Sequence, residues 1–79
     1  MNCYSNKYAQ KVYEVLLPII GETMSKGVIR SAAVSLGTEE ESFVLEDMPN
    51  LAERIAKGLV VFLGSDTASK VATRISQIK

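Results

Sequence analysis

The stretch that decides the fold runs from Asp47 to Leu63 and reads DMPNLAERIAKGLVVFL. Its apolar side chains recur at the spacing of one helix face, at Leu51, Ile55, Leu59 and Phe62. Asp47 is suited to cap this helix, and Pro49 fits its first turn because backbone N–H groups there have no intrahelical partner. Gly64 follows the last apolar residue, where glycine can end a helix in a left-handed conformation. The sequence therefore predicts a central helix over residues 47–63.

The second half of this helix is apolar around its whole circumference, because residues 59–63 are all apolar. A helix of this kind is normally covered on several sides. Either the other helices of a short chain surround it, or part of its surface contacts another molecule. The candidate interaction surface on its outer side consists of Val60, Val61 and Leu63.

Two helices are expected before the central one. The first is capped by Ser5 and runs to about residue 17, because Pro18 ends or kinks a helix. The second runs from about Glu22 to Leu36, and Gly37 ends it. Both segments repeat apolar residues at helical spacing.

A short helical turn is expected before the central helix, and a last helix is expected after it. Thr38 and Glu41 have the spacing of a capping box, which predicts a single helical turn over residues 38–43. The apolar residues that follow would fill the core, namely Phe43, Val44 and Leu45. Ser65 caps a last helix, whose buried stripe is expected to contain Ala68, Val71, Ala72, Ile75 and Ile78.

Two glycines lie in helix interiors, where each costs about 1 kcal/mol relative to alanine. They are Gly27 and Gly58, each preceded by a lysine. Close approach of another helix is a usual reason for such a glycine, so we expect at least one of them at a helix crossing. The residues around the two Lys-Gly pairs stop matching each other within a few positions, so this similarity does not predict an internal duplication.

The chain is expected to be a single all-α domain over residues 1–79, with residues 1–4 frayed. The helices are joined by short, glycine-marked connections, which favour a compact small bundle of four main helices plus one short helical turn. Nearly half of the residues are apolar (47%), which is enough core material for a folded domain.

Charge is balanced overall but is unevenly distributed. Nine basic and nine acidic residues give a net charge of zero, which argues against nucleic-acid or anionic-membrane binding. The acidic residues gather within residues 39–47, at Glu39, Glu40, Glu41, Glu46 and Asp47. We interpret this cluster as a solvent-exposed segment at the N-terminal end of the central helix. The alternative is an acidic face that binds a partner.

Residue types that support catalysis or metal binding are scarce. The chain has no histidine and one cysteine, Cys3, which excludes an intramolecular disulfide and a cysteine-based zinc site. The acidic cluster does not match a calcium loop, and no glycine-rich phosphate loop is present. We therefore expect no cofactor, no metal and no enzymatic activity, and interpret Cys3 as inert rather than as a redox or attachment site.

No apolar run approaches the roughly 20 residues that span a bilayer, and no segment resembles a signal peptide. We therefore expect a cytoplasmic protein without a membrane partner. Residue patterns favour a non-catalytic protein–protein interaction or self-association module, which could be a homodimer.

The alternative function is a small helix-turn-helix DNA-binding protein that uses the last two helices. Gly64 and Ser65 would form the corner, and the DNA-facing cations would be Lys57, Lys70 and Arg74. Against this alternative, Val60 and Phe62 stand where the motif usually needs a small residue, and Asp66 would face phosphates. Nucleic acid is therefore the less favoured partner.

Overall fold

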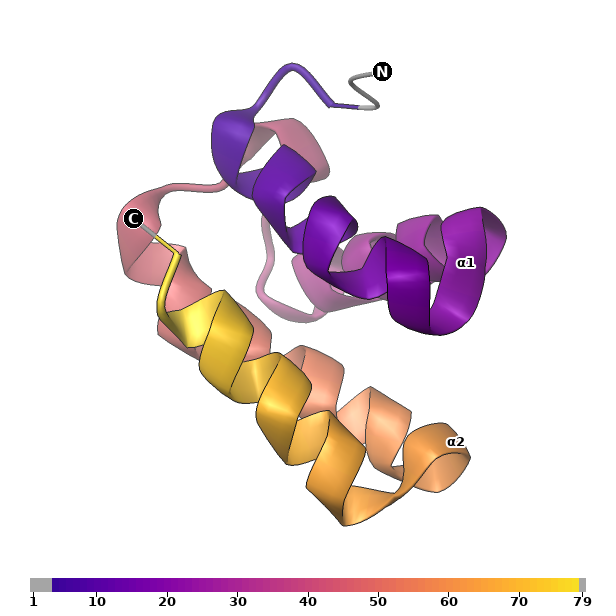
Figure 1. Ribbon diagram of the computed structural model, residues 1–79. Helices are drawn as coiled ribbons and strands as arrows, with labels where there is room; N and C mark the ends of the chain where they lie inside the picture. The colour runs from indigo at the N-terminus through magenta and orange to yellow at the C-terminus, as the bar shows by residue number, and fades with distance from the viewer. Residues whose placement is uncertain (1–3, 79) are drawn as a thin grey trace.

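The structure is a computed structural model that describes residues 4–78, and all regular structure in this range is helical. Two helices of 29 residues each, α1 (Lys7–Ser35) and α2 (Met48–Ser76), are joined by two 3-10 turns, η1 (Glu40–Ser42) and η2 (Leu45–Asp47) (Figure 1). The prediction of an all-α fold is confirmed. Neither helix contains, in the described residues, an apolar stretch that could cross a membrane.

The prediction of four main helices is wrong, because each long helix continues through the glycine that was expected to end it. Gly21 (φ 82°, ψ 173°) and Gly64 (φ 83°, ψ 165°) each kink their helix sharply, and helical structure resumes at the next residue. Only glycine adopts this backbone conformation readily. A single residue therefore redirects the chain without a separating loop.

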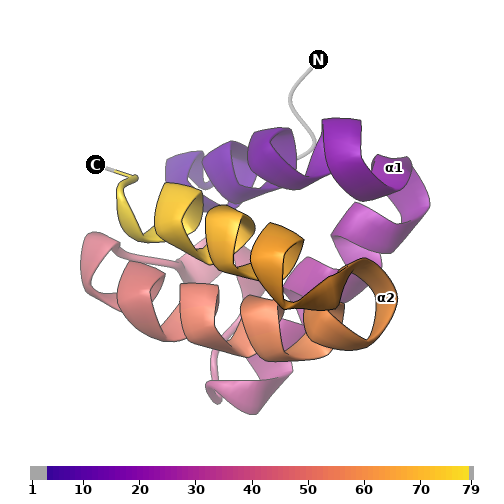
Figure 2. The ribbon, with the colours of Figure 1, turned by 60° about the horizontal axis from the view of Figure 1, so that its bottom comes forward.

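Each kinked helix has two limbs, and the kink between them is called its elbow. The limbs of α1 are residues 7–20 and 22–35, and those of α2 are residues 48–63 and 65–76. The two limbs of α2 run back alongside each other, and both elbows lie on the same side of the molecule (Figures 1 and 2). The expected end of the first helix near residue 17 is also wrong, since α1 passes through Pro18 and turns only at Gly21.

Hydrogen bonds at the two ends of α1 define where it begins and stops. Asn6, rather than Ser5, is the N-cap, and its side-chain oxygen accepts hydrogen bonds from the backbone N–H groups of Tyr8 and Ala9 at 2.9 and 3.1 Å. At the other end, Gly37 and Thr38 donate to carbonyls of the last turn, the arrangement of a Schellman motif. The expected stop at Gly37 agrees with this arrangement.

The core is built from both helices and from the connection between them. Its fully buried large side chains come from both limbs of each helix and include Leu16, Ile29, Leu51, Leu59 and Ile75. Phe43 in the connection is also buried, as expected. The expectation that Val44 and Leu45 fill the core is wrong, because η2 turns them outward.

The two long helices repeat one pattern at an offset of 43 residues. The elbows Gly21 and Gly64 correspond, and the same offset pairs residues that are buried in both helices: Ala9 with Ala52, Val12 with Ile55, Leu16 with Leu59, and Ala32 with Ile75. The Lys-Gly echo in the sequence has a different spacing and is unrelated to this pattern. The repeat therefore lies in the backbone conformation and in the positions that are buried.

Candidate interaction site

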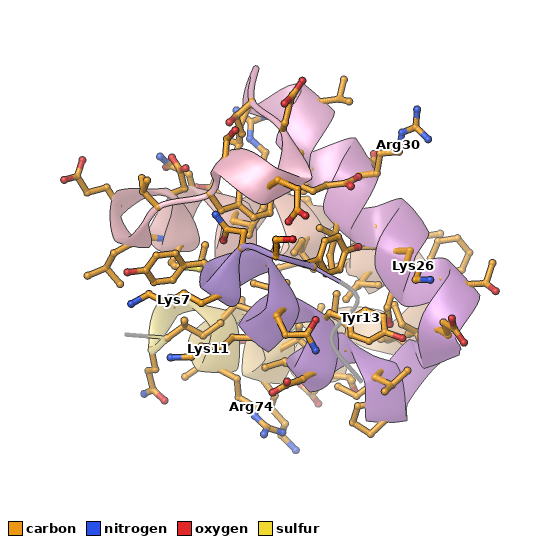
Figure 3. All side chains as sticks on the ribbon, turned by 90° about the horizontal axis from the view of Figure 1, so that it is seen from above. Lys7, Lys11, Tyr13, Lys26, Arg30 and Arg74 are labelled. Carbon is orange, nitrogen blue, oxygen red and sulfur yellow. The ribbon has the colours of Figure 1, made fainter. Side chains whose placement is uncertain are left out.

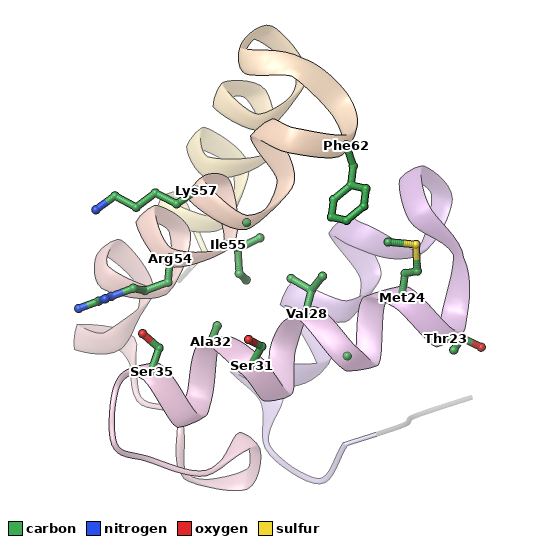
Figure 4. A pocket seen from close by; sticks show the side chains of 12 residues that line it. Thr23, Met24, Val28, Ser31, Ala32, Ser35, Arg54, Ile55, Lys57 and Phe62 are labelled. Atoms are coloured by element: carbon green, nitrogen blue, oxygen red, sulfur yellow. The ribbon is translucent and has the colours of Figure 1, made fainter.

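A groove of about 650 Å³ lies between the second limb of α1 and the first limb of α2 (Figure 4). Ser35 and Arg54 lie at one end, whereas Met24 and Phe62 lie on opposite walls at the other end. Its volume falls in the range of ligand and anchor pockets, but it is open to solvent along its length.

Gly27 and Gly58 line this groove from opposite helices. No atom lies within 4 Å of the position that a Cβ would occupy at either residue. The expectation that one of them permits a close helix crossing is therefore wrong. Both glycines instead keep the groove wide, because a side chain at either position would extend into the groove and fill part of it.

Two cationic residues, Arg54 and Lys57, line the groove and no acidic residue does; both side chains extend toward the side away from Met24 and Phe62 (Figure 4). The Lys57 ammonium pairs with the exposed Glu53 carboxylate one turn earlier, with 3.1 Å between Nζ and Oε1. Arg54 forms no ion pair with any residue between positions 4 and 78. The guanidinium group is therefore available to a carboxylate from outside the chain.

The structure places two of the three predicted interaction residues on the surface. Val61 is 83% exposed and Val60 is exposed to a smaller degree, whereas Leu63 is half-buried against the core. Phe62 was expected in the buried stripe, and this expectation is wrong, because its side chain is 68% exposed. Its apolar neighbours on both sides were the only signal in the sequence for this exposure.

Exposed apolar side chains gather around both elbows. Leu17 and Ile19 precede Gly21 in α1, just as Val60, Val61 and Phe62 precede Gly64 in α2. Met24 follows the first elbow and, with Phe62, continues this surface into the groove. We call these six residues, together with the groove, the elbow surface.

The cations predicted to face DNA are distributed over both limbs of α2. Lys57 lines the groove on the first limb, and Lys70 and Arg74 are exposed one turn apart on the second limb. Figure 3 shows Arg74 on the side of the molecule where Lys7 and Lys11 of α1 also lie. The structure therefore places Lys57 at the groove, on a different limb of α2 from Lys70 and Arg74.

Glu41, in the acidic cluster, has a structural role that the sequence did not reveal. Glu41 accepts hydrogen bonds from the backbone N–H groups of Ser5 and Asn6, both at 3.0 Å, and these bonds lower the pKa of its carboxyl group. The capping box expected between Thr38 and Glu41 is wrong, because Glu41 instead contacts the chain just before α1. No cluster of side chains in residues 4–78 has the composition of a metal site, and Cys3 lies outside the described residues.

Comparison of the chain with protein-family models, with curated proteins and with solved structures gives no match.

Proposed function

We propose that the protein is a non-catalytic interaction module that binds itself or another protein through the elbow surface. The observation that carries this proposal is the exposure of Val61 and Phe62, two adjacent large apolar side chains. Full burial of such a side chain contributes roughly 1.5–3 kcal/mol. Exposed apolar groups that gather in one place are typical of protein interaction sites, whereas scattered ones need no explanation.

The residue types around the groove also support this proposal. Aromatic, methionine and arginine side chains are enriched in the buried centres of protein interfaces, and Phe62, Met24 and Arg54 line the groove together. An open groove buries only one face of its occupant. This geometry is better suited to a protein surface than to a small substrate, which usually buries most of its own surface.

Catalysis has little support from the same residues. The chain has no histidine, and neither a carboxylate nor a thiol lines the groove. Histidine and carboxylates are the commonest general acids and bases, and a serine or threonine hydroxyl needs such an adjacent base to act as a nucleophile. The Lys57 ammonium of the groove already pairs with the Glu53 carboxylate. The groove offers apolar contacts, hydroxyl groups and positive charge, which are means of binding.

DNA binding has less support than protein binding. The net charge of zero gives no general attraction to phosphates, and Asp66 begins the segment that would enter the groove of the duplex. Titration of the protein with duplex DNA at low and moderate salt distinguishes DNA binding from protein binding. Affinity that falls steeply with salt and is lost in Lys70→Glu would favour the DNA-binding alternative.

The proposal is tested by comparing Val61→Glu with Val34→Glu. Val34 is 71% exposed and lies on the second limb of α1, so it offers a matched valine outside the elbow surface. We expect light scattering to show that wild type and Val34→Glu associate as concentration rises, whereas Val61→Glu stays a folded monomer.

A wild-type protein that remains monomeric at millimolar concentration would contradict self-association. Capture from native lysate with wild type and Val61→Glu as paired baits then tests binding to another protein. If both baits retain the same proteins, the elbow surface is not an interaction site.

A further inference from the structure

We infer that the elbow surface accepts the η2 corner of a second copy of this chain, so that copies associate head to tail. The η2 corner is defined as Val44, Leu45 and Glu46. This inference rests on the proposed function and goes further, because it names the partner and the segment that binds.

The η2 corner is the second place where adjacent large apolar side chains are exposed. Val44 is 50% exposed and Leu45 is 48% exposed, and the exposed Glu46 follows them. An apolar pair beside a carboxylate complements a groove that combines Met24 and Phe62 with cationic side chains.

The η2 corner is held in its outward conformation by the residues on both sides of it. Phe43 and Met48 are buried in the core, and the Asp47 carboxylate accepts a hydrogen bond from the Val44 backbone N–H at 3.2 Å. A segment that is already ordered loses little conformational entropy when it binds. The corner can therefore dock without refolding.

The positions of the two surfaces require a second molecule. The η2 corner lies at one side of the molecule and both elbows lie at the other, in both ribbon views (Figures 1 and 2). A single chain therefore cannot place its own corner against its own elbow surface. Every copy carries both surfaces, and contacts between unlike surfaces produce either a ring or an open chain of copies.

Charge argues against the alternative in which two elbow surfaces face each other. That arrangement would bring Arg54 and Lys57 of one copy toward the same cations of the other. Like charges in an interface oppose association. In the head-to-tail arrangement the same cations meet Glu46, and residues 39–47 contain five acidic residues and no basic residue.

The test uses two variants that each block one surface. Phe62→Glu blocks the elbow surface, and Leu45→Lys blocks the η2 corner; both residues are exposed, so both proteins should fold. We expect each variant alone to be monomeric at concentrations where wild type associates. An equimolar mixture should form a 1:1 complex that grows no further, because Leu45→Lys supplies the elbow surface and Phe62→Glu supplies the corner.

Circular dichroism of each variant checks that it is folded, and a charge exchange provides a second test. Glu46→Arg should weaken association at least tenfold, and Arg54→Glu with Lys57→Glu should do the same. Mixing these two proteins should restore at least part of the lost affinity, because the opposite charges meet again.

The outcomes separate this inference from the proposed function. If Leu45→Lys associates like wild type while Phe62→Glu is monomeric, the elbow surface binds another part of the chain, and only the head-to-tail inference fails. If both variants associate like wild type, self-association through the elbow surface fails together with the head-to-tail inference. A monomeric wild type, or a mixture in which no 1:1 complex forms, also overturns the head-to-tail contact.

Discussion

Asn6 and Glu41 join the beginning of α1 to the connection between the helices through two hydrogen bonds, both donated by Asn6 and accepted by Glu41. The Asn6 backbone N–H donates to Glu41 Oε1 at 3.0 Å, and Asn6 Nδ2 donates to the Glu41 carbonyl oxygen at 3.1 Å. The same Nδ2 donates to the Phe43 carbonyl at 2.8 Å, while Asn6 Oδ1 caps the helix. One side chain therefore orders a helix end and the segment that carries the buried Phe43.

Asn6→Ala is expected to lower the free energy of unfolding by about 1–2 kcal/mol. The change removes a helix cap, which typically contributes about 1 kcal/mol, and two further hydrogen bonds to the connection. Chemical denaturation measures the loss. Asn50→Ala is the control, since Asn50 is exposed near the start of α2 and its side chain makes no such hydrogen bond within residues 4–78. An equal loss in both variants would contradict the prediction.

Stability is expected to depend on the ionisation of Glu41. Hydrogen bonds from Asn6 and Ser5 lower its pKa in the folded state below the ordinary value of 4.5. The carboxylate therefore stabilises the fold above its unfolded-state pKa, and this contribution is lost as pH falls through the folded-state pKa. Glu41→Gln should melt at a lower temperature than wild type at pH 7, and the difference should shrink at pH 3.

Thermal melts of Glu40→Gln over the same pH range provide the control. Glu40 is the preceding residue and makes no backbone hydrogen bond of this kind among residues 4–78. A difference between wild type and Glu41→Gln that stays constant from pH 7 to pH 3 would show that the ionised carboxylate does not stabilise the fold.

Alanine at either elbow is expected to destabilise the protein. Gly21 and Gly64 combine positive φ with extended ψ, a region that is almost restricted to glycine. A residue with a Cβ is strained there by roughly 1–3 kcal/mol, although no neighbouring atom blocks the side chain. Denaturant midpoints should therefore fall for Gly21→Ala and for Gly64→Ala, and unchanged midpoints would refute the role of these residues in the kinks.

Alanine at the groove glycines is expected to have the opposite effect. Gly27 and Gly58 are helical, and an added Cβ meets no atom within 4 Å. Each substitution should stabilise the isolated chain by up to about 1 kcal/mol through helix propensity. Denaturant midpoints that fall for both variants would mean that these positions are more crowded than the structure shows.

Local residue patterns determined the helical content, the buried faces and the positions of the chain reversals. Apolar spacing identified Leu51, Ile55 and Leu59 as core residues, and glycines marked both elbows. The spacing of side chains along a helix is a local property, so it can be predicted without knowledge of the fold. Each helix stays continuous through the reversal at Gly21 or Gly64. This continuity depends on the φ and ψ angles of that one glycine, which residue spacing does not encode.

Exposure and long-range hydrogen bonds were decided only by the tertiary structure. Phe62 has the spacing of a core residue but is 68% exposed, while the next residue, Leu63, packs against the core. Glu41 has the spacing of a local cap but binds Asn6, 35 residues away in the sequence. The groove likewise exists only because the second limb of α1 and the first limb of α2, which are far apart in the sequence, line the same space. Burial and partner choice depend on which segments pack together, and local sequence patterns do not contain that information.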